Sequence, residues 1–120
     1  MPAKNAAFLQ RPALQDDFMV WADVLKLLAH PSRLCLIEAL ANGERCVGDL
    51  TEVIGHDIST VSKHLNLLRE GGLVEDQKRG KQVYYRLRIP AVLHVFYCLD
   101  SICRARSQLE PKSPVAPIPR

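Results

Sequence analysis

The chain has 120 residues, of which 48% are hydrophobic and 24% charged, and its formal net charge is +3. This length suffices for one folded domain and is too short for two domains with separate cores. No apolar run approaches the roughly 20 residues of a membrane span, and no basic stretch followed by an apolar segment marks a secretory signal. We therefore expect a single folded domain in the cytoplasm, without a membrane partner.

The positive charge is concentrated in the middle of the chain. Residues 1–58 hold five Lys and Arg against eight Asp and Glu, whereas residues 59–89 hold seven against three. Residues 90–120 hold four against two. A local basic segment is typical of a nucleic-acid footprint when it coincides with a suitable structural motif.

Residues 1–13 lack a clear period and contain two prolines, so we interpret them as a flexible N-terminal arm. After this arm, apolar residues at helical spacing predict four successive helices. Their expected ranges are 15–29, 31–42, 46–54 and 58–70. Pro31 suits the first turn of the second helix, Asp57 suits the N-cap of the fourth, and Gly71-Gly72 ends the fourth.

Beyond Gly72 the sequence pattern changes from helical to strand-like. Leu73-Val74 opens a strand, residues 78–81 make a turn around a glycine, and residues 82–87 form a second strand rich in β-formers. These segments predict a β-hairpin with a basic tip.

An amphipathic helix is expected from Pro90 to about Ser107, followed by a disordered, proline-rich tail over 108–120. Four helices, a hairpin and a last helix follow the plan of a winged helix-turn-helix domain, here over residues 14–107. The predicted fold is therefore mainly α with a small β-hairpin.

The fourth helix has a polar outer face, and no acidic residue occurs between Ser59 and Arg69. Short hydroxyl residues at a helix start allow close approach to DNA and can bond to phosphates or base edges. Cations at the hairpin tip are placed to reach the DNA backbone or minor groove. An ordinary surface helix with a Ser/Thr-rich first turn is the alternative interpretation. The candidate DNA-binding residues are Ser59, Thr60, Ser62, Lys63, His64, Asn66, Lys78, Arg79 and Lys81.

Five stretches together resemble the ArsR/SmtB family of metal- and stress-responsive repressors, in unbroken order over about half of the chain. They are Leu28-Ala29-His30-Pro31-Ser32-Arg33-Leu34, Gly43-Glu44-Arg45-Cys46-Val47-Gly48-Asp49-Leu50, Ser59-Thr60-Val61-Ser62-Lys63-His64-Leu65, Leu68-Arg69-Glu70-Gly71-Gly72-Leu73-Val74 and Gly80-Lys81-Gln82-Val83-Tyr84-Tyr85-Arg86-Leu87. The resemblance implies a homodimer joined through the first and last helices. It also implies a double-stranded DNA operator with an inverted repeat, from which a bound ligand releases the repressor.

The base-reading positions of the family fall on Ile58, Ser59, Ser62 and Lys63 of this chain. Ile58 departs from the polar residue usual at the first of them. An isoleucine at this point either reads a thymine methyl group or simply packs against the protein.

Apolar residues form a second stripe on the first helix and a seam on the last helix. One stripe per helix suffices for a small core, so the extra ones favour a partner subunit, the alternative being that both are core. The expected dimer-interface residues are Phe18, Trp21, Leu25, Val92, Phe96 and Leu99.

The chain has four cysteines, which a reducing compartment keeps from forming structural disulfides. Neither standard metal site of the family is intact, because Gly48 and Thr51 stand where further thiols follow Cys46, and the acid-x-His opening of the last-helix site is missing. The first hypothesis is a soft-metal or metalloid site for arsenite, antimonite or cadmium. Its candidate ligands are Cys46, Cys98 and Cys103.

Two other hypotheses for the cysteines stay open. Relatives with a dithiol redox or sulfide switch pair a thiol of the second helix with one near the end of the last, and Cys35 and Cys103 lie near those positions. Alternatively, the cysteines are small buried hydrophobic residues without a sensing role. No cofactor is required for folding in any of the three.

No nucleotide-binding loop, paired carboxylates or nucleophile–base set occurs in the sequence, so we do not expect an enzyme. The predicted function is a sequence-specific transcriptional repressor released from DNA by a thiol-binding effector. A winged helix that binds proteins without DNA is the rival class.

Overall fold

A computed structural model describes residues 15–109 of the chain, with five α-helices, one 3-10 helix and three strands in that range. They are α2 (Gln15–Leu28), α3 (Pro31–Ala39), β1 (Arg45–Cys46), α4 (Val47–Ile54), α5 (Ile58–Glu70), β2 (Val74–Arg79), β3 (Gln82–Leu87), η1 (Pro90–Val92) and α6 (Leu93–Leu109). The predicted arm over 1–13 lies outside the described residues, as do residues 110–120 of the predicted tail, whereas residues 108–109 of that tail belong to helix α6. No helix in the described range is long and apolar enough to cross a membrane.

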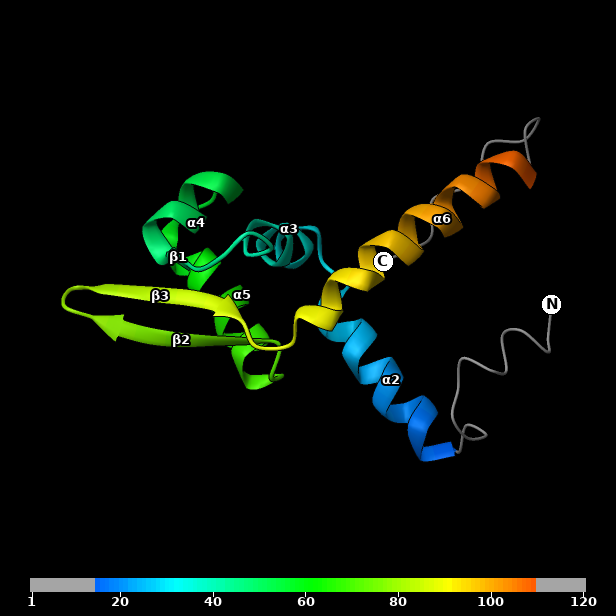
Figure 1. Cartoon of the computed structure of the whole chain (residues 1–120), viewed down its shortest axis with the longest axis horizontal. Helices are drawn as coiled ribbons and strands as arrows, with labels where there is room; N and C mark the ends of the chain where they lie inside the picture. The colour runs from blue at the N-terminus through cyan, green and yellow to red at the C-terminus, as the bar shows by residue number, and fades with distance from the viewer. Residues whose placement is uncertain (1–14, 110–120) are drawn as a thin grey trace.

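The fold is the expected winged helix-turn-helix, with the hairpin β2–β3 extending to one side and α2 and α6 projecting on the other (Figure 1). Helix α5 and strand β3 have the predicted bounds. The hairpin turn is tighter than expected: β2 continues to Arg79, so only Gly80 and Lys81 connect the strands, and Gly80 takes φ +61°. Helix α6 is preceded by the 3-10 turn η1 and ends at Leu109, two residues beyond the expected end.

The sheet contains a third strand that the sequence pattern did not predict. The strand order is β1-β3-β2, and Arg45 and Cys46 of β1 pair antiparallel with Tyr85 and Tyr84 of β3. A strand of two residues is too short to show an alternating pattern. Because Cys46 belongs to β1, helix α4 begins at Val47, one residue later than expected.

The core lies between α3, α4, α5 and the base of the hairpin. Its fully buried side chains are Leu36, Ile37, Leu50, Val61, Leu65, Leu68 and Val74. Burying one such side chain contributes about 2 kcal/mol. Because three of these residues come from α5, the core fixes which face of α5 points outward.

The end of α5 is formed by a Schellman motif at the two glycines. The amide of Gly72 donates to the carbonyl of Arg69, and the amide of Leu73 donates to that of Leu68, both at 3.0 Å. Gly72 has φ +83°, which favours glycine, whereas Gly71 has an ordinary φ of −78°. The need for Gly71 is steric, because a Cβ there would lie 2.1 Å from Cδ2 of Leu27 on α2.

Candidate nucleic-acid interface

The outer face of α5 carries polar side chains that the core leaves exposed. Ser59, Lys63 and Asn66 are exposed and lie within about 60° of one another around the helix axis. Ser62 is half-buried on the adjacent flank, one turn after the exposed Ile58. The structure thus brings most of the sequence-predicted helix residues to one surface at the start of α5.

The first turn of α5 is organised by Asp57. This residue is the N-cap by backbone geometry, and its carboxylate accepts hydrogen bonds from the hydroxyls of Ser59 at 2.5 Å and Thr60 at 2.6 Å. These bonds, that from Ser59 first, hold the pKa of the Asp57 carboxyl below its ordinary value of 3.8. Both hydroxyls therefore donate within the protein, next to a carboxylate that stays ionised at neutral pH.

His64 does not lie on the outer face with the other candidates. It is half-buried on the flank of α5 toward α3, with its ring centroid 4.4 Å from that of His30. Nη1 of Arg33 lies 3.4 Å from Nδ1 of His64, and Nε of Arg33 donates to the carbonyl of Leu27 at 2.6 Å. Burial first, and then the neighbouring His30, Arg33 and His56, lower the pKa of His64 from 6.5. His64 therefore contacts His30 and Arg33 at the start of α3, and Arg33 in turn connects this cluster to the end of α2.

The three wing cations differ in their surroundings. Lys78 and Lys81 are exposed, and the structure records no ion pair for either of them among the described residues. Arg79 instead donates to Glu44 and to Gln77, at 3.0 and 2.8 Å through Nη2, and lies over the ring of Tyr84 at 4.8 Å. The guanidinium is held at the wing, and this arrangement lowers the pKa of Glu44 through the hydrogen bond from Arg79.

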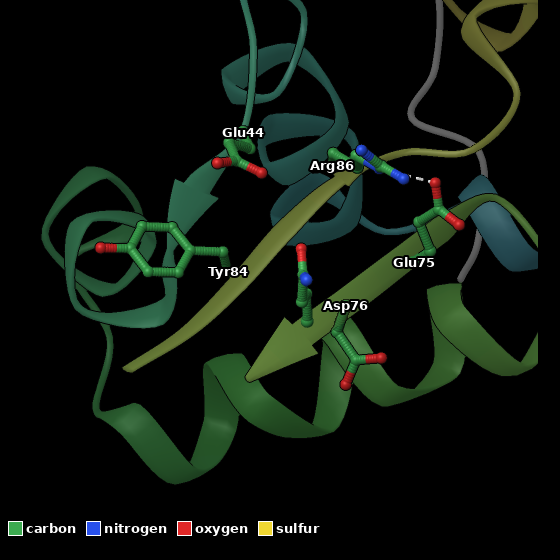
Figure 2. Close-up of a pocket in the computed structure, with 6 residues that line it drawn as sticks. Glu44, Glu75, Asp76, Tyr84 and Arg86 are labelled. Atoms are coloured by element: carbon green, nitrogen blue, oxygen red, sulfur yellow. Dashed lines mark hydrogen bonds and ion pairs between the residues drawn. The ribbon is translucent and has the colours of Figure 1, made fainter. Parts of the chain in front are cut away.

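A small, open cavity of about 180 Å³ lies beside this ion pair on the face of the sheet (Figure 2). Figure 2 shows Arg86 of β3 bound to Glu75 of β2, with Glu44 and Asp76 nearby. Asp76 accepts a hydrogen bond from Arg69 of α5 at 2.9 Å. Each of these carboxylates has an arginine partner, whereas Lys78 and Lys81 near the wing tip have no ionic partner among the described residues. Sequence reasoning missed Glu44, whose only signal was its charge.

The cysteines do not converge within the described part of one chain. Cys98 and Cys103 are exposed on α6, whereas Cys35 of α3 and Cys46 of β1 are half-buried. Among residues 15–109 no group of three His, Cys, Asp or Glu side chains is placed to hold a metal ion. A three-thiol site inside one protomer therefore has no support in this range.

Apolar side chains are exposed along the two projecting helices. On α2, Phe18, Trp21 and Leu25 are 52%, 42% and 57% exposed, and the first two rings make an edge-to-face contact. On α6, Leu99 is exposed, Phe96 is half-buried against the core, and Tyr97 and Ile102 add further exposed apolar surface. Val92 is only 7% exposed and belongs to the core of the protomer, not to this surface.

Residues 30–76 match the signature of a family described as "Bacterial regulatory protein, arsR family". The chain is 47% identical over 66 residues to the biofilm growth-associated repressor of Xylella fastidiosa (strain Temecula1 / ATCC 700964). That alignment covers 55% of this chain and 58% of the relative, which is less than two thirds of its length. The chain is 43% identical over 78 residues to the arsenical resistance operon repressor of Escherichia coli (strain K12), covering 62% of this chain and 67% of that protein.

A similar solved structure is the homodimeric winged helix-turn-helix DNA-binding domain Mb0332 from Mycobacterium bovis, described as a possible ArsR-family regulator. It superposes with a TM-score of 0.64 at 29% identity, covering 90% of this chain and all of that one. The sequence signature, the relatives and the fold agree. The chain belongs to the ArsR/SmtB family of winged helix-turn-helix regulatory proteins.

Proposed function

We propose that this protein is a sequence-specific DNA-binding transcriptional repressor. The observation that carries the proposal is the outer face of α5, where Ser59, Lys63 and Asn66 are exposed together, in a chain whose wing carries the exposed Lys78 and Lys81 near its tip. A helix of this kind enters the major groove with its first turns, while lysines neutralise phosphates on either side. ArsR-family winged-helix proteins are non-enzymatic regulators, in agreement with the expectation that the chain is not an enzyme.

The proposed repressor acts as a homodimer joined through α2 and α6. The exposed apolar side chains of both helices support this arrangement, as does the homodimeric state of the similar M. bovis domain. Contiguous apolar surface of this kind is typical of a subunit interface. The two recognition helices of a dimer would bind the two half-sites of an inverted repeat, and the centres of these half-sites would lie roughly 34 Å apart.

An electrophoretic mobility shift with the DNA upstream of the protein's own operon tests DNA binding. We expect a specific complex whose affinity falls steeply between about 50 and 200 mM salt, because phosphate contacts release counterions. A protein-binding winged helix without a DNA role would show no complex at low salt, and this result would refute the proposal. Sedimentation of the full chain tests the dimer.

The proposed effector is a soft metal or metalloid of the arsenite, antimonite or cadmium class that binds thiols. Two observations support this class: Cys98 and Cys103 are exposed on α6, and a relative is named an arsenical resistance operon repressor. Soft thiolates prefer such ions to harder ones. Since the described residues of one protomer hold no three-ligand cluster, the ligands would be brought together across the dimer, with Cys46 as a further candidate.

A dithiol redox or sulfide response is the alternative, with Cys35 of α3 and Cys103 of α6 as its candidate thiols. The discriminating experiment repeats the mobility shift with arsenite, antimonite, cadmium, zinc and a polysulfide, for the wild type and each Cys→Ser variant. Release by metalloids that requires Cys98 supports the first class. Release by polysulfide that requires Cys35 and Cys103 supports the second. If no thiol substitution changes any response, both are refuted.

A further inference from the structure

An exposed isoleucine occupies the first position of the recognition helix. The side chain of Ile58 is 55% exposed and is absent from the buried core, which leaves out the interpretation that it simply packs inside the domain. It lies one turn before Ser62 and next to Ser59 on the outer side of α5. A large apolar group thus stands at the point of the helix that enters a major groove first.

The polar groups nearest to Ile58 are already engaged. The hydroxyls of Ser59 and Thr60 both donate to the carboxylate of Asp57, so neither proton is free for a phosphate or a base. The Asp57 carboxylate itself repels phosphate oxygens. The two hydroxyls of the first turn are therefore not free donors, and the exposed apolar surface of that turn is the hydrocarbon of Ile58.

The major groove offers one apolar feature to such a side chain, the C5-methyl group of thymine. We infer that Ile58 is a specificity-determining residue that selects thymine in each operator half-site by contact with its methyl group. The inference rests on the proposed DNA-binding function and deepens it by naming what the first turn reads. Lys63, an exposed residue five positions further along α5, anchors the phosphate and holds the register of this contact.

The contact between Ile58 and thymine depends on a single methyl group of the base. Burying one methyl-sized group strengthens binding by about fourfold. Thymine and uracil pair identically and differ only in this methyl, so replacing thymine by deoxyuridine removes the contact and leaves the Watson–Crick pairing unchanged. Methylation of cytosine at C5 adds the same group to a different base.

The experiment first selects the preferred site of the full-length protein from a randomised duplex pool. Fluorescence anisotropy then measures the affinity for this site with each thymine replaced in turn by deoxyuridine, in the wild type and in Ile58→Ala. We expect one thymine per half-site whose replacement weakens wild-type binding about fourfold. Ile58→Ala should bind the thymine site as weakly as the wild type binds the uracil site, and should not distinguish the two.

Leu67→Ala is the matched control, because Leu67 is a comparably exposed apolar residue nine positions further along α5. It should keep the full response to deoxyuridine, and circular dichroism should show that both variants melt like the wild type. A cytosine replacement at the critical position should recover part of the affinity when its C5 is methylated, in the wild type only.

The outcomes separate the two proposals. If the pool yields no bound duplex at low salt, the proposed DNA-binding function fails, and the thymine contact fails with it. If the protein selects a defined site but no deoxyuridine replacement weakens binding, or if Ile58→Ala keeps the full thymine preference, the inference about Ile58 is refuted and the repressor function stands.

Discussion

The paired glycines between α5 and the wing give a prediction in which two opposing effects can be weighed. At Gly71, φ is −78°, so alanine is allowed there and would restrict the unfolded chain, a gain of about 0.4–1 kcal/mol. The new Cβ, however, would lie 2.1 Å from Cδ2 and 3.2 Å from Cγ of Leu27. Leu27 must move, and such overpacking costs about 1–3 kcal/mol. We expect Gly71→Ala to lower the free energy of unfolding by about 1–2 kcal/mol.

Gly72 should respond for a different reason. Its φ of +83° disfavours any side chain by about 1–2 kcal/mol, while among residues 15–109 an added Cβ would approach only Nη1 of Arg88, at 4.0 Å. A second substitution, Leu27→Ala, therefore distinguishes the two glycines. Leu27→Ala should remove the clash at Gly71, so the double variant Leu27→Ala/Gly71→Ala should lose less free energy of unfolding than the sum of its two single variants. In Leu27→Ala/Gly72→Ala, the two losses should be additive.

Urea denaturation followed by circular dichroism measures all five variants, and a loss of 1 kcal/mol corresponds to roughly 4–8 °C in Tm for a domain of this size. The reasoning is refuted if Gly71→Ala stabilises the protein, or if Leu27→Ala rescues Gly72→Ala as well as it rescues Gly71→Ala. Either result would mean that the close approach of α2 to the end of α5 does not govern this joint.

Three further predictions concern charges and thiols. Glu44→Gln should raise DNA affinity about twofold and steepen its salt dependence, because it removes an anion and releases Arg79; an unchanged affinity would show that the pair has no role in binding. Because the pKa of His64 is lowered below 6.5 in the folded chain, the unfolded chain binds more protons as the pH falls through this value. Stability should therefore decrease from pH 7.5 to 5.5 in the wild type, and less so in His64→Gln, as measured by urea unfolding. Cys98→Ser and Cys103→Ser should retain DNA binding yet abolish release by arsenite, and a variant that still responds normally would remove its thiol from the effector site.

Much of the fold follows from local patterns in the sequence. The bounds of α5 and β3 were predicted correctly, because Asp57 and Gly71-Gly72 delimit a strongly periodic segment and the β-formers of 82–87 are contiguous. The strand β1 was missed, since its two residues become a strand only by pairing with β3. Local sequence patterns predict helices and strands, but they carry no information on which distant segments pair with one another.

In the candidate site, contacts between residues distant in sequence also determine side-chain positions that local patterns do not predict. His64 faces inward because His30 and Arg33, about 30 residues earlier, lie beside it, and Arg79 is held by Glu44, 35 residues away. Asp57 was expected as a helix cap, but its hydrogen bonds to two hydroxyls could not be read from the cap pattern. The contact of the remaining residues with DNA, and the dimer seam, stay predictions.

The salt dependence of operator binding tests the central claim most directly. If Lys63, Lys78 and Lys81 of both protomers each neutralise a phosphate, six contacts give a slope of log K against log salt of about −5. Lys63→Ala should make this slope shallower by about 2 units without changing Tm, whereas Lys26→Ala, an exposed lysine of α2, should leave it unchanged. A slope near zero, or equal slopes for the wild type and Lys63→Ala, would contradict the assignment of α5 and the wing tip as the DNA-binding surface.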